Sequence, residues 1–375
     1  MKKKQLKVLV APNSMKGSLN AFDFADEVEK AFMKISSGFL VRKIPVADGG
    51  DFTGEVLCNA LGAKVVEVEV KDPLGRPVRA KYARAGKKAV IEMADASGIK
   101  LLRPNELNPL ETSSFGTGQL INEAINAGCT EILLGVGGSA TVDGGLGMVE
   151  ALGFQLFDKK GKKLGGKGKN LERVEKIEKP AFPANLSVKV ICDVDNPLLG
   201  ENGAAKVFGP QKGATSPMVE RLEKGLSHWS EILQRETGID FSKQNGAGAA
   251  GGIALPLLAF FHAEIVPGAA FVLQELNFDE AVQWADFVIT GEGKIDHQTL
   301  YDKAPKAVAD VARRYRKPVF AIGGTVTRDA SAAFDGIFSL VSGPVSLEKA
   351  MNNAAELLFD FSFELAKLIH AVSNK

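Results

Sequence analysis

Two aspartates and a lysine occupy one glycine- and proline-rich stretch of this sequence. Asp193 and Asp195 follow the apolar run from Val188 to Cys192, which predicts a buried strand that ends where open α/β sheets usually place ligand crevices. Residues two apart on a strand share a face, so each carboxylate would raise the pKa of the other unless a cation lies between them. The pair predicts a Mg²⁺ site, and Lys212, in a Pro-Gln-Lys-Gly turn, could supply positive charge for a phosphate group. The alternative is a capped turn with solvated acids.

A glycine-rich loop after the apolar run 131–136 is the second candidate. Its backbone N–H groups, followed by a helix N-terminus and assisted by two hydroxyl groups, predict a cradle for an anion such as phosphate. The residues expected to bind this anion are Gly137, Gly138, Ser139, Thr141, Gly144 and Gly145. The sequence contains no G-x-x-x-x-G-K-[ST] and no protein-kinase signature, so a phosphotransferase here would use a different fold.

The same loop allows a rival interpretation as a dinucleotide fingerprint. Residues 135–140 match G-x-G-x-x-A after a strand, and Asp158 lies 18 residues beyond Ala140. Against this interpretation, the glycines at 144, 145 and 147 would break the helix that such a turn must open. A nicotinamide cofactor is therefore the weaker alternative.

Strand-terminal loops near both ends of the chain carry further polar residues. Ser14 and Lys16 follow the first apolar run, Asp48 follows the second, and Glu292 and Asp296 follow the run that begins at 287. All of these loops are expected at ligand-facing ends of strands. The last two acids could bind a metal or a substrate, or could form an N-cap and turn.

Both ends of the chain alternate strands with helices, whereas the middle begins with consecutive strands that indicate an antiparallel meander. The expected strands are 6–11, 39–46, 64–70, 78–83, 89–93, 131–136, 188–192, 287–290, 319–322 and 336–341. The expected helices are 20–35, 53–61, 116–127, 144–152, 218–234, 246–261, 270–284, 305–315 and 347–369.

This pattern predicts an α/β protein of two domains. Residues 1–63 and 285–375 are expected to form a doubly wound, Rossmann-like domain with a parallel sheet. Residues 64–284 are expected to form an inserted α/β domain that carries the antiparallel meander and the glycine-rich phosphate loop. Because the polar loops are shared between the two, we expect the site in a cleft between the domains.

The composition excludes several classes of function. Net charge is +1, and the lysine-rich segment 159–169 has no interleaved aromatic residue, so no nucleic-acid partner is expected. No run of 18 apolar residues occurs, so no membrane partner is expected either. The three cysteines lie far apart without zinc-site spacing, which indicates a reduced, cytoplasmic location. We expect a monomer or a homodimer.

Taken together, these loops resemble the type I glycerate kinase family over nearly the whole chain. The segments that carry the resemblance are 11–19, 46–50, 114–118, 137–145, 192–197, 208–214, 248–252 and 290–299. The resemblance implies ATP- and Mg²⁺-dependent phosphorylation of D-glycerate, mainly at the 2-hydroxyl, to give 2-phosphoglycerate, with 3-phosphoglycerate as the alternative product.

These loops suggest a division of roles. One member of the Asp193/Asp195 pair would orient or deprotonate the glycerate hydroxyl while the other helps to hold Mg²⁺. The expected catalytic residues are Asp193, Asp195, Lys16, Asp48 and Lys212; the nucleotide-binding residues are Gly137, Gly138, Ser139, Thr141, Gly144, Gly145, Ser14 and Glu292; and the metal ligands are Asp193, Asp48 and Asp296.

The sequence departs from the usual family pattern at positions that bear on chemistry. These positions are Asn13 for Asp, Met15 for Phe, Asp51-Phe52 for Glu-Gly, Val142 for Asn and Asp302 for Gly. Asn13 removes a negative charge near the expected phosphate path, and Val142 removes an amide from the anion loop, so turnover or substrate preference is expected to differ. Two other functions stay open: a nicotinamide-dependent hydroxy-acid dehydrogenase and a non-catalytic sugar-acid sensor.

Overall fold

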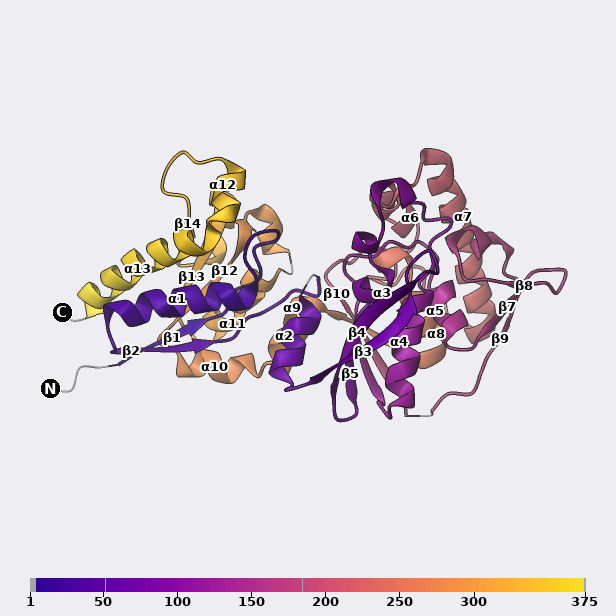
Figure 1. The fold of residues 1–375 in the computed structure, drawn as a ribbon, viewed down its shortest axis with the longest axis horizontal. Helices are drawn as coiled ribbons and strands as arrows, with labels where there is room; N and C mark the ends of the chain where they lie inside the picture. The colour runs from indigo at the N-terminus through magenta and orange to yellow at the C-terminus, as the bar shows by residue number, and fades with distance from the viewer. Residues whose placement is uncertain (1–4, 51, 184, 302, 374–375) are drawn as a thin grey trace. The chain divides into compact units, whose positions relative to one another are not determined.

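The computed structural model describes residues 5–50, 52–183, 185–301 and 303–373 (Figure 1). Asp51 and Asp302, two of the departures named above, lie outside the described residues. The chain divides into two compact units, the first formed by Met1–Asp48 with Gly268–Lys375 and the second by Gly49–Pro267. We call them the terminal unit and the central unit. The cleft that the sequence predicts between them remains a prediction.

The terminal unit is built on a five-stranded sheet in which every neighbouring pair is parallel, in the order β14-β13-β12-β1-β2. Its strands are β1 Leu6–Val10, β2 Phe39–Lys43, β12 Phe287–Ile295, β13 Val319–Val326 and β14 Gly336–Ser339. This confirms the doubly wound parallel sheet, with the strand order of flavodoxin-like folds. In that order the direction of winding reverses between β1 and β12, and ligands bind beyond the carboxyl ends of the strands at this switch point.

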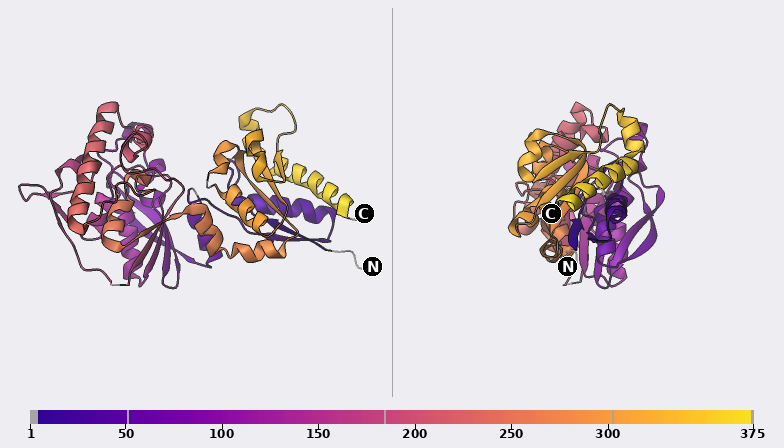
Figure 2. Two further views of the ribbon diagram at one scale, coloured as in Figure 1. Left: turned by 180° about the vertical axis from the view of Figure 1, so that it is seen from behind. Right: turned by 90° about the vertical axis from the view of Figure 1, so that its left-hand side faces the viewer.

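Helices cover both faces of this sheet. Val8 and Val10 point into a core shared with α1 and α13, whereas Leu9 and Ala11 point into a core shared with α9, α10 and α11, as the two-residue period of a strand requires. The helices are α1 Ala21–Ile35, α9 Gly268–Glu275, α10 Phe278–Trp284, α11 Ala304–Arg314, α12 Leu347–Asn352 and α13 Ala354–Ser373. Figures 1 and 2 show α1 and α13 side by side along the sheet.

Helix α1 illustrates how the sequence forms these elements. Asn20 is its N-cap, and the side chain accepts a hydrogen bond from the N–H of Asp23 at 2.8 Å. Phe24, Val28 and Phe32 recur at helical spacing and are fully buried against the sheet. The capped start and the apolar stripe together anchor the loop before the helix, which carries Ser14 and Lys16.

The central unit contains a six-stranded mixed sheet in the order β11-β10-β6-β5-β4-β3. Strands β3, β4 and β5 are antiparallel neighbours, whereas β5, β6, β10 and β11 run parallel. The strands are β3 Lys64–Lys71, β4 Pro77–Ala85, β5 Lys88–Glu92, β6 Glu131–Gly135, β10 Ser187–Cys192 and β11 Glu264–Pro267, with a small separate sheet of β7 Gln155–Phe157, β8 Lys163–Leu164 and β9 Lys176–Glu178.

The helices of the central unit include one that the sequence pattern grouped with the terminal segments. They are α2 Thr53–Ala60, α3 Ala94–Ser97, α4 Phe115–Asn126, α5 Leu146–Ala151, α6 Ala204–Phe208, α7 Ser216–Thr237 and α8 Ala254–Phe261. Helix α2 packs on β4 and β5, so it belongs to this unit although the expected boundary lay near residue 63. None of the helices in the described ranges has the length and apolar character needed to cross a bilayer.

Short 3₁₀ helices complete the fold, and three of the expected helices are interrupted. The 3₁₀ helices are Ile99–Leu101, Pro104–Glu106, Gly168–Arg173, Pro210–Lys212, Ala249–Gly251, His297–Leu300 and Arg328–Ala333. The single helix expected at 246–261 begins only at Ala254, because Ala250, Gly251 and Gly252 all have left-handed backbones, with φ 49°, 74° and 86°. The helix expected at 270–284 is two helices, separated at Asn277, which also has φ 49°. The Gly251-Gly252 pair was a local signal for the first break, whereas the second, at Asn277, has no glycine. The helix expected at 347–369 is also two helices, α12 and α13, which separate at Asn353.

Candidate functional site

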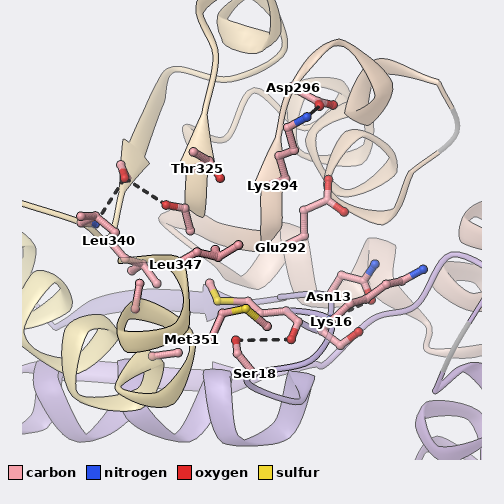
Figure 3. A pocket seen from close by; sticks show the side chains of 18 of the residues that line it. Asn13, Lys16, Ser18, Glu292, Lys294, Asp296, Thr325, Leu340, Leu347 and Met351 are labelled. Atoms are coloured by element: carbon pink, nitrogen blue, oxygen red, sulfur yellow. Dashed lines mark hydrogen bonds and ion pairs between the residues drawn. The ribbon is translucent and has the colours of Figure 1, made fainter. Parts of the chain in front are cut away.

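A cavity of about 790 Å³ lies at the carboxyl ends of the strands in the terminal unit (Figure 3). It is lined by the loop after β1, by Asp48 beyond β2, by the end of β12 and by residues of β13 and β14. Five of the site residues predicted from the sequence line it, namely Ser14, Lys16, Asp48, Glu292 and Asp296. Its volume is in the usual range of small-molecule sites, and it lies at the switch point of the sheet.

The cavity has a polar part and an apolar part. The polar part includes Asn13, Lys16, Asp48, Glu292, Lys294, Asp296 and Lys303. The apolar part, which we call the apolar wall, consists of Leu340, Val341, Val345, Leu347, Ala350, Met351, Ala354 and Leu357. In Figure 3, Leu340, Leu347 and Met351 lie on one side, and Asn13, Lys16 and Glu292 lie on the other. Sequence reasoning did not identify the apolar wall.

Asp48 is almost completely buried at the edge of this cavity. The amide Nδ2 of Asn13 donates to its Oδ2 at 3.3 Å, and the ammonium of Lys303 lies 3.5 Å from the same oxygen. The Oδ1 of Asn13 also accepts a hydrogen bond from the N–H of Ser14 at 2.8 Å. An aspartate at position 13 would bring a second negative charge toward Asp48, whereas the amide of this chain donates to it.

Glu292 is an acid of this cavity whose pKa is raised. Burial raises its pKa to about 7, and the charges of Asp48 and Asp296 act in the same direction. A hydrogen bond from the hydroxyl of Thr299 at 2.7 Å and the charge of Lys303 oppose this rise. A group that titrates near neutrality inside a cavity is a candidate for ligand binding or proton transfer.

Asp296 serves as an N-cap, one of the two roles that its sequence context allowed. Its Oδ1 accepts the N–H of Gln298 at 2.8 Å, which caps the 3₁₀ helix His297–Leu300. Its Oδ2 lies 2.6 Å from the ammonium of Lys294, and this hydrogen bond is the main cause of the lowered pKa of Asp296. Both carboxylate oxygens are therefore engaged within the terminal unit.

In the central unit, the side chain of Lys212 is buried against the glycine-rich loop and does not lie at a surface. Its ammonium nitrogen Nζ is 2.7 Å from Ser139 Oγ and 2.7 Å from the carbonyl oxygen of Thr141, and only 2% of the residue is exposed. Burial lowers its pKa to about 7, although the charge of Asp143 opposes this. The lysine thus joins the loop after β6 to the turn at 210–213. The Oγ1 of Thr141 is buried and has no hydrogen-bond partner among the described residues.

Asp143 holds this loop together through several hydrogen bonds. It was not among the candidate site residues predicted from the sequence. Its carboxylate accepts hydrogen bonds from the N–H and the Oγ of Ser114, at 2.7 and 2.8 Å, and from the N–H groups of Gly145 and Gly147, both at 3.2 Å. Burial raises its pKa, and these donors oppose the rise. The available signal was that Asp143 is the one acid in the glycine-rich segment 137–145.

These bonds engage two of the amides that the sequence assigned to a phosphate. The N–H of Gly145 donates to Asp143, and the N–H of Gly144 donates to the carbonyl of Gly251 at 3.0 Å. A Cβ atom at Gly144 would lie 2.7 Å from Cδ1 of Trp229, so the glycine is required by close packing. The N-terminus of helix α5 is therefore capped by the carboxylate of Asp143, a side chain of the protein itself.

Asp193 and Asp195 follow the neighbouring strand, but they do not lie on it. Strand β10 ends at Cys192, so the two acids belong to the succeeding loop; Asp193 is half-buried and Asp195 is exposed. The last residues of β10 and β6 are in register, with Ile191 opposite Gly135. The two loops therefore leave the same edge of the central sheet.

No group of three His, Cys, Asp or Glu side chains in the described part of the chain is arranged to hold a metal ion. Of the predicted ligands, Asp48 and Asp296 belong to the terminal unit, and Asp193 belongs to the central unit. The metal site and the site roles given to these residues therefore remain predictions.

Comparison with known proteins gives consistent matches over nearly the entire sequence. The profile of the Glycerate kinase family matches residues 8–370. A glycerate kinase of Bacillus subtilis (strain 168) is 43% identical over 362 residues, which cover 94% of this chain and 95% of that protein. A glycerate 2-kinase of Escherichia coli (strain K12) is 41% identical over 358 residues, which cover 93% and 94%. A crystal structure from Salmonella typhimurium LT2, assigned to glycerate kinase 2, superposes with a TM-score of 0.89 at 40% identity and covers 99% of this chain and 100% of that one.

Proposed function

This chain belongs to the glycerate kinase family of phosphotransferases, and from that premise we propose that it transfers a phosphoryl group from ATP to D-glycerate with the help of Mg²⁺. The acceptor in this proposal is the 2-hydroxyl, and the product is 2-phosphoglycerate. The similarity to a glycerate 2-kinase over 93% of the chain supports this choice of hydroxyl. Phosphorylation of the 3-hydroxyl is the alternative.

The cavity of the terminal unit is the observation that carries the proposal. Lys16 and Lys303 contribute positive charge to a space that Asp48 and Glu292 also line. Transfer of a phosphoryl group depends on positioning and on stabilising negative charge, and lysine supplies a compact positive charge for phosphate oxygens. In this proposal Lys16, which is exposed to the cavity, neutralises charge on the transferred group or on the carboxylate of glycerate.

The carboxylates of the cavity fit the way in which proteins bind Mg²⁺. This ion prefers oxygen ligands and is usually held by one or two carboxylates together with water and substrate phosphates, so a cluster of three protein ligands is not required. Asp48 and Glu292 would hold it, since like charge from Asp48 contributes to the raised pKa of Glu292 and a cation would relieve this repulsion. When bound, the ion would neutralise negative charge on the phosphate groups.

In the central unit we assign different tasks to the acids and to the lysine. Asp193 or Asp195 would orient the glycerate hydroxyl and accept its proton. Lys212 is too deeply buried for a direct phosphate contact, so we propose that it positions Ser139 and Thr141, which both receive its hydrogen bonds. The loop would then present Ser139 and the half-buried Gly137 to the substrate.

A coupled assay for ADP release, with D-glycerate, ATP and Mg²⁺, tests the proposal, and ³¹P NMR of the product distinguishes 2- from 3-phosphoglycerate. A hydroxy-acid dehydrogenase would instead change the absorbance of a nicotinamide cofactor and consume no ATP. A sugar-acid sensor would bind D-glycerate without either reaction. Absence of ADP release over a range of Mg²⁺ concentrations would remove the kinase proposal.

The cellular setting is part of the proposal. The cysteines Cys58, Cys129 and Cys192 are all free, which is consistent with the reduced, cytoplasmic location that we propose. The oligomeric state, expected to be a monomer or a homodimer, remains a prediction. Sedimentation equilibrium would measure it.

A further inference from the structure

The apolar wall exposes large hydrophobic side chains at the mouth of the cavity. Leu347 is 75% exposed and Val345 is 37% exposed, and both line the cavity of the terminal unit. They lie at or just before the first turn of α12, the helix that follows β14 in the chain. Exposed apolar groups that gather at a concave site, beside polar residues, are a mark of ligand binding.

Two methionines, Met351 of the wall and Met15, bring the wall to the loop after β1. Met15 is buried and lines the cavity together with Met351 of α12. A Cβ atom at Gly17 would lie 3.0 Å from the terminal methyl Cε of Met351, so this side chain lies directly against the loop that carries Lys16. Thioether groups adapt to the shape of a ligand and make favourable contacts with aromatic rings.

The opposite part of the cavity carries charge. Lys16, Lys294 and Lys303 line it, and the ammonium of Lys303 lies beside Asp48. A ligand that fits both parts needs a flat apolar or aromatic group at one end and several negative charges at the other, within about 790 Å³. A nucleoside di- or triphosphate has this distribution of groups.

We propose that the apolar wall, with Met15, binds the base of the nucleotide and that the phosphates extend toward Lys16 and Lys303. This inference rests on the proposed kinase function, and it assigns the nucleotide to the terminal unit rather than to the glycine-rich loop of the central unit, where the sequence alone placed the phosphates. The engagement of the Gly144 and Gly145 amides within the protein supports the same assignment.

Two leucine substitutions provide a matched test in the full-length protein. Leu347→Ser removes an exposed leucine of the apolar wall, whereas Leu368→Ser removes a 62% exposed leucine of α13 that does not line the cavity. Titration calorimetry with ADP should show about tenfold weaker binding for Leu347→Ser, which corresponds to loss of one partly buried apolar contact, and no change for Leu368→Ser. Inorganic tripolyphosphate, which has no base, should bind both variants as it binds the parent protein.

The outcomes separate this inference from the kinase proposal. Unchanged ADP affinity in Leu347→Ser, or an equal loss of ADP and tripolyphosphate affinity, would overturn the assignment of the base. Lack of ADP binding by the parent protein would overturn it as well. If ADP binds through Leu347 but no ADP is formed from ATP in the presence of D-glycerate, the base site stands and the kinase proposal fails. Val345→Ser offers a second substitution in the same wall and should weaken ADP in the same direction.

Discussion

Both units contain glycine-rich loops with polar residues after parallel strands, but the polar residues of these loops have different partners in the two units. In the terminal unit, Lys16 is exposed to a cavity, and Asp48 and Glu292 line it. In the central unit, Lys212 and Asp143 are buried, and both side chains are engaged by other groups of the protein. Of these two loop arrangements, only the first leaves charge accessible to a ligand.

This difference teaches that a strand-terminal glycine loop is not by itself a binding loop. Whether such a loop binds a ligand depends on whether its hydrogen-bond donors and acceptors are already paired within the protein. Asp143 takes the N–H groups of Gly145 and Gly147, so the protein supplies its own anion at that helix N-terminus. We therefore infer that the terminal unit binds the nucleotide, whereas the glycine loop of the central unit holds its own side chains, such as Ser139, in position.

Asp193→Asn and Asp195→Asn should each lower kcat by about two orders of magnitude or more, the usual effect of losing a positioned base or charge stabiliser. These acids leave the same sheet edge as the glycine loop, so they are the part of the central unit expected to meet substrate. The measurement is steady-state kinetics with D-glycerate. Asp240→Asn, at an exposed acid elsewhere in this unit, is the control and should leave kcat unchanged. Near-normal turnover in both variants would exclude the pair from the mechanism.

Lys16→Met and Lys212→Met compare an exposed lysine with a buried one. Lys16→Met should raise KM for ATP by about tenfold, because one charge–phosphate contact is lost, without changing Tm. Lys212→Met leaves the Thr141 carbonyl and Ser139 without their partner, so it should destabilise the protein by about 1–3 kcal/mol and lower Tm. Calorimetry and kinetics on both variants give the comparison. Equal effects on Tm would contradict the division into a binding lysine and a positioning lysine.

Glu292→Gln should stabilise the protein at high pH. In the unfolded chain this carboxyl ionises near its ordinary pKa of 4.5, but in the folded protein burial keeps it protonated to about pH 7. The folded state therefore binds an additional proton between these values, so stability falls as pH rises from about 4.5 to 7, and the loss is complete above 7. Removing the ionisable group should add about 1–2 kcal/mol at pH 8, less than the full shift implies because the side chain is partly exposed.

Thermal unfolding at pH 5 and pH 8 measures this effect. The gain in Tm of Glu292→Gln over the parent should be present at pH 8 and small at pH 5. Glu348→Gln, at an exposed glutamate of α12, should show no gain at either pH. A gain that is independent of pH would show that the ionisation of Glu292 is not its source.

Much of the fold was predictable because it follows from local periodicity. The strand–helix alternation at both ends of the chain predicted the parallel sheet, and parallel strands bring their following loops to one edge. For this reason Ser14, Lys16, Asp48 and Glu292, far apart in sequence, could be expected near one another, and they line one cavity.

The parts that could not be predicted depend on contacts between distant residues. The partner of Asp143 is Ser114, 29 residues away, and that of Asp48 is Lys303. Neither pairing leaves a local pattern in the sequence. The apolar wall was missed for a related reason: Leu347 and Met351 show the spacing of a helix that packs on a core, and only the structure reveals that they line a cavity.

The smallest expected effect concerns the choice of base. The side chains of the apolar wall carry no strong hydrogen-bond donor or acceptor, and the hydroxyl of Ser339, which also lines the cavity, already donates to the carbonyl of Gly324 at 3.2 Å. Sites that recognise a ligand through apolar contacts discriminate weakly, whereas sites with buried polar partners reject the wrong ligand by orders of magnitude. ADP and GDP should therefore bind with dissociation constants that differ by only about two- to tenfold, and Leu347→Ser should weaken both to the same extent. Competition titrations on the full-length protein measure this ratio, with tripolyphosphate as the baseless control. A preference for ADP of 100-fold or more would show that backbone groups recognise the edge of the base. The terminal unit would then bind its nucleotide through directed hydrogen bonds, the kind of interaction that holds the glycine loop of the central unit.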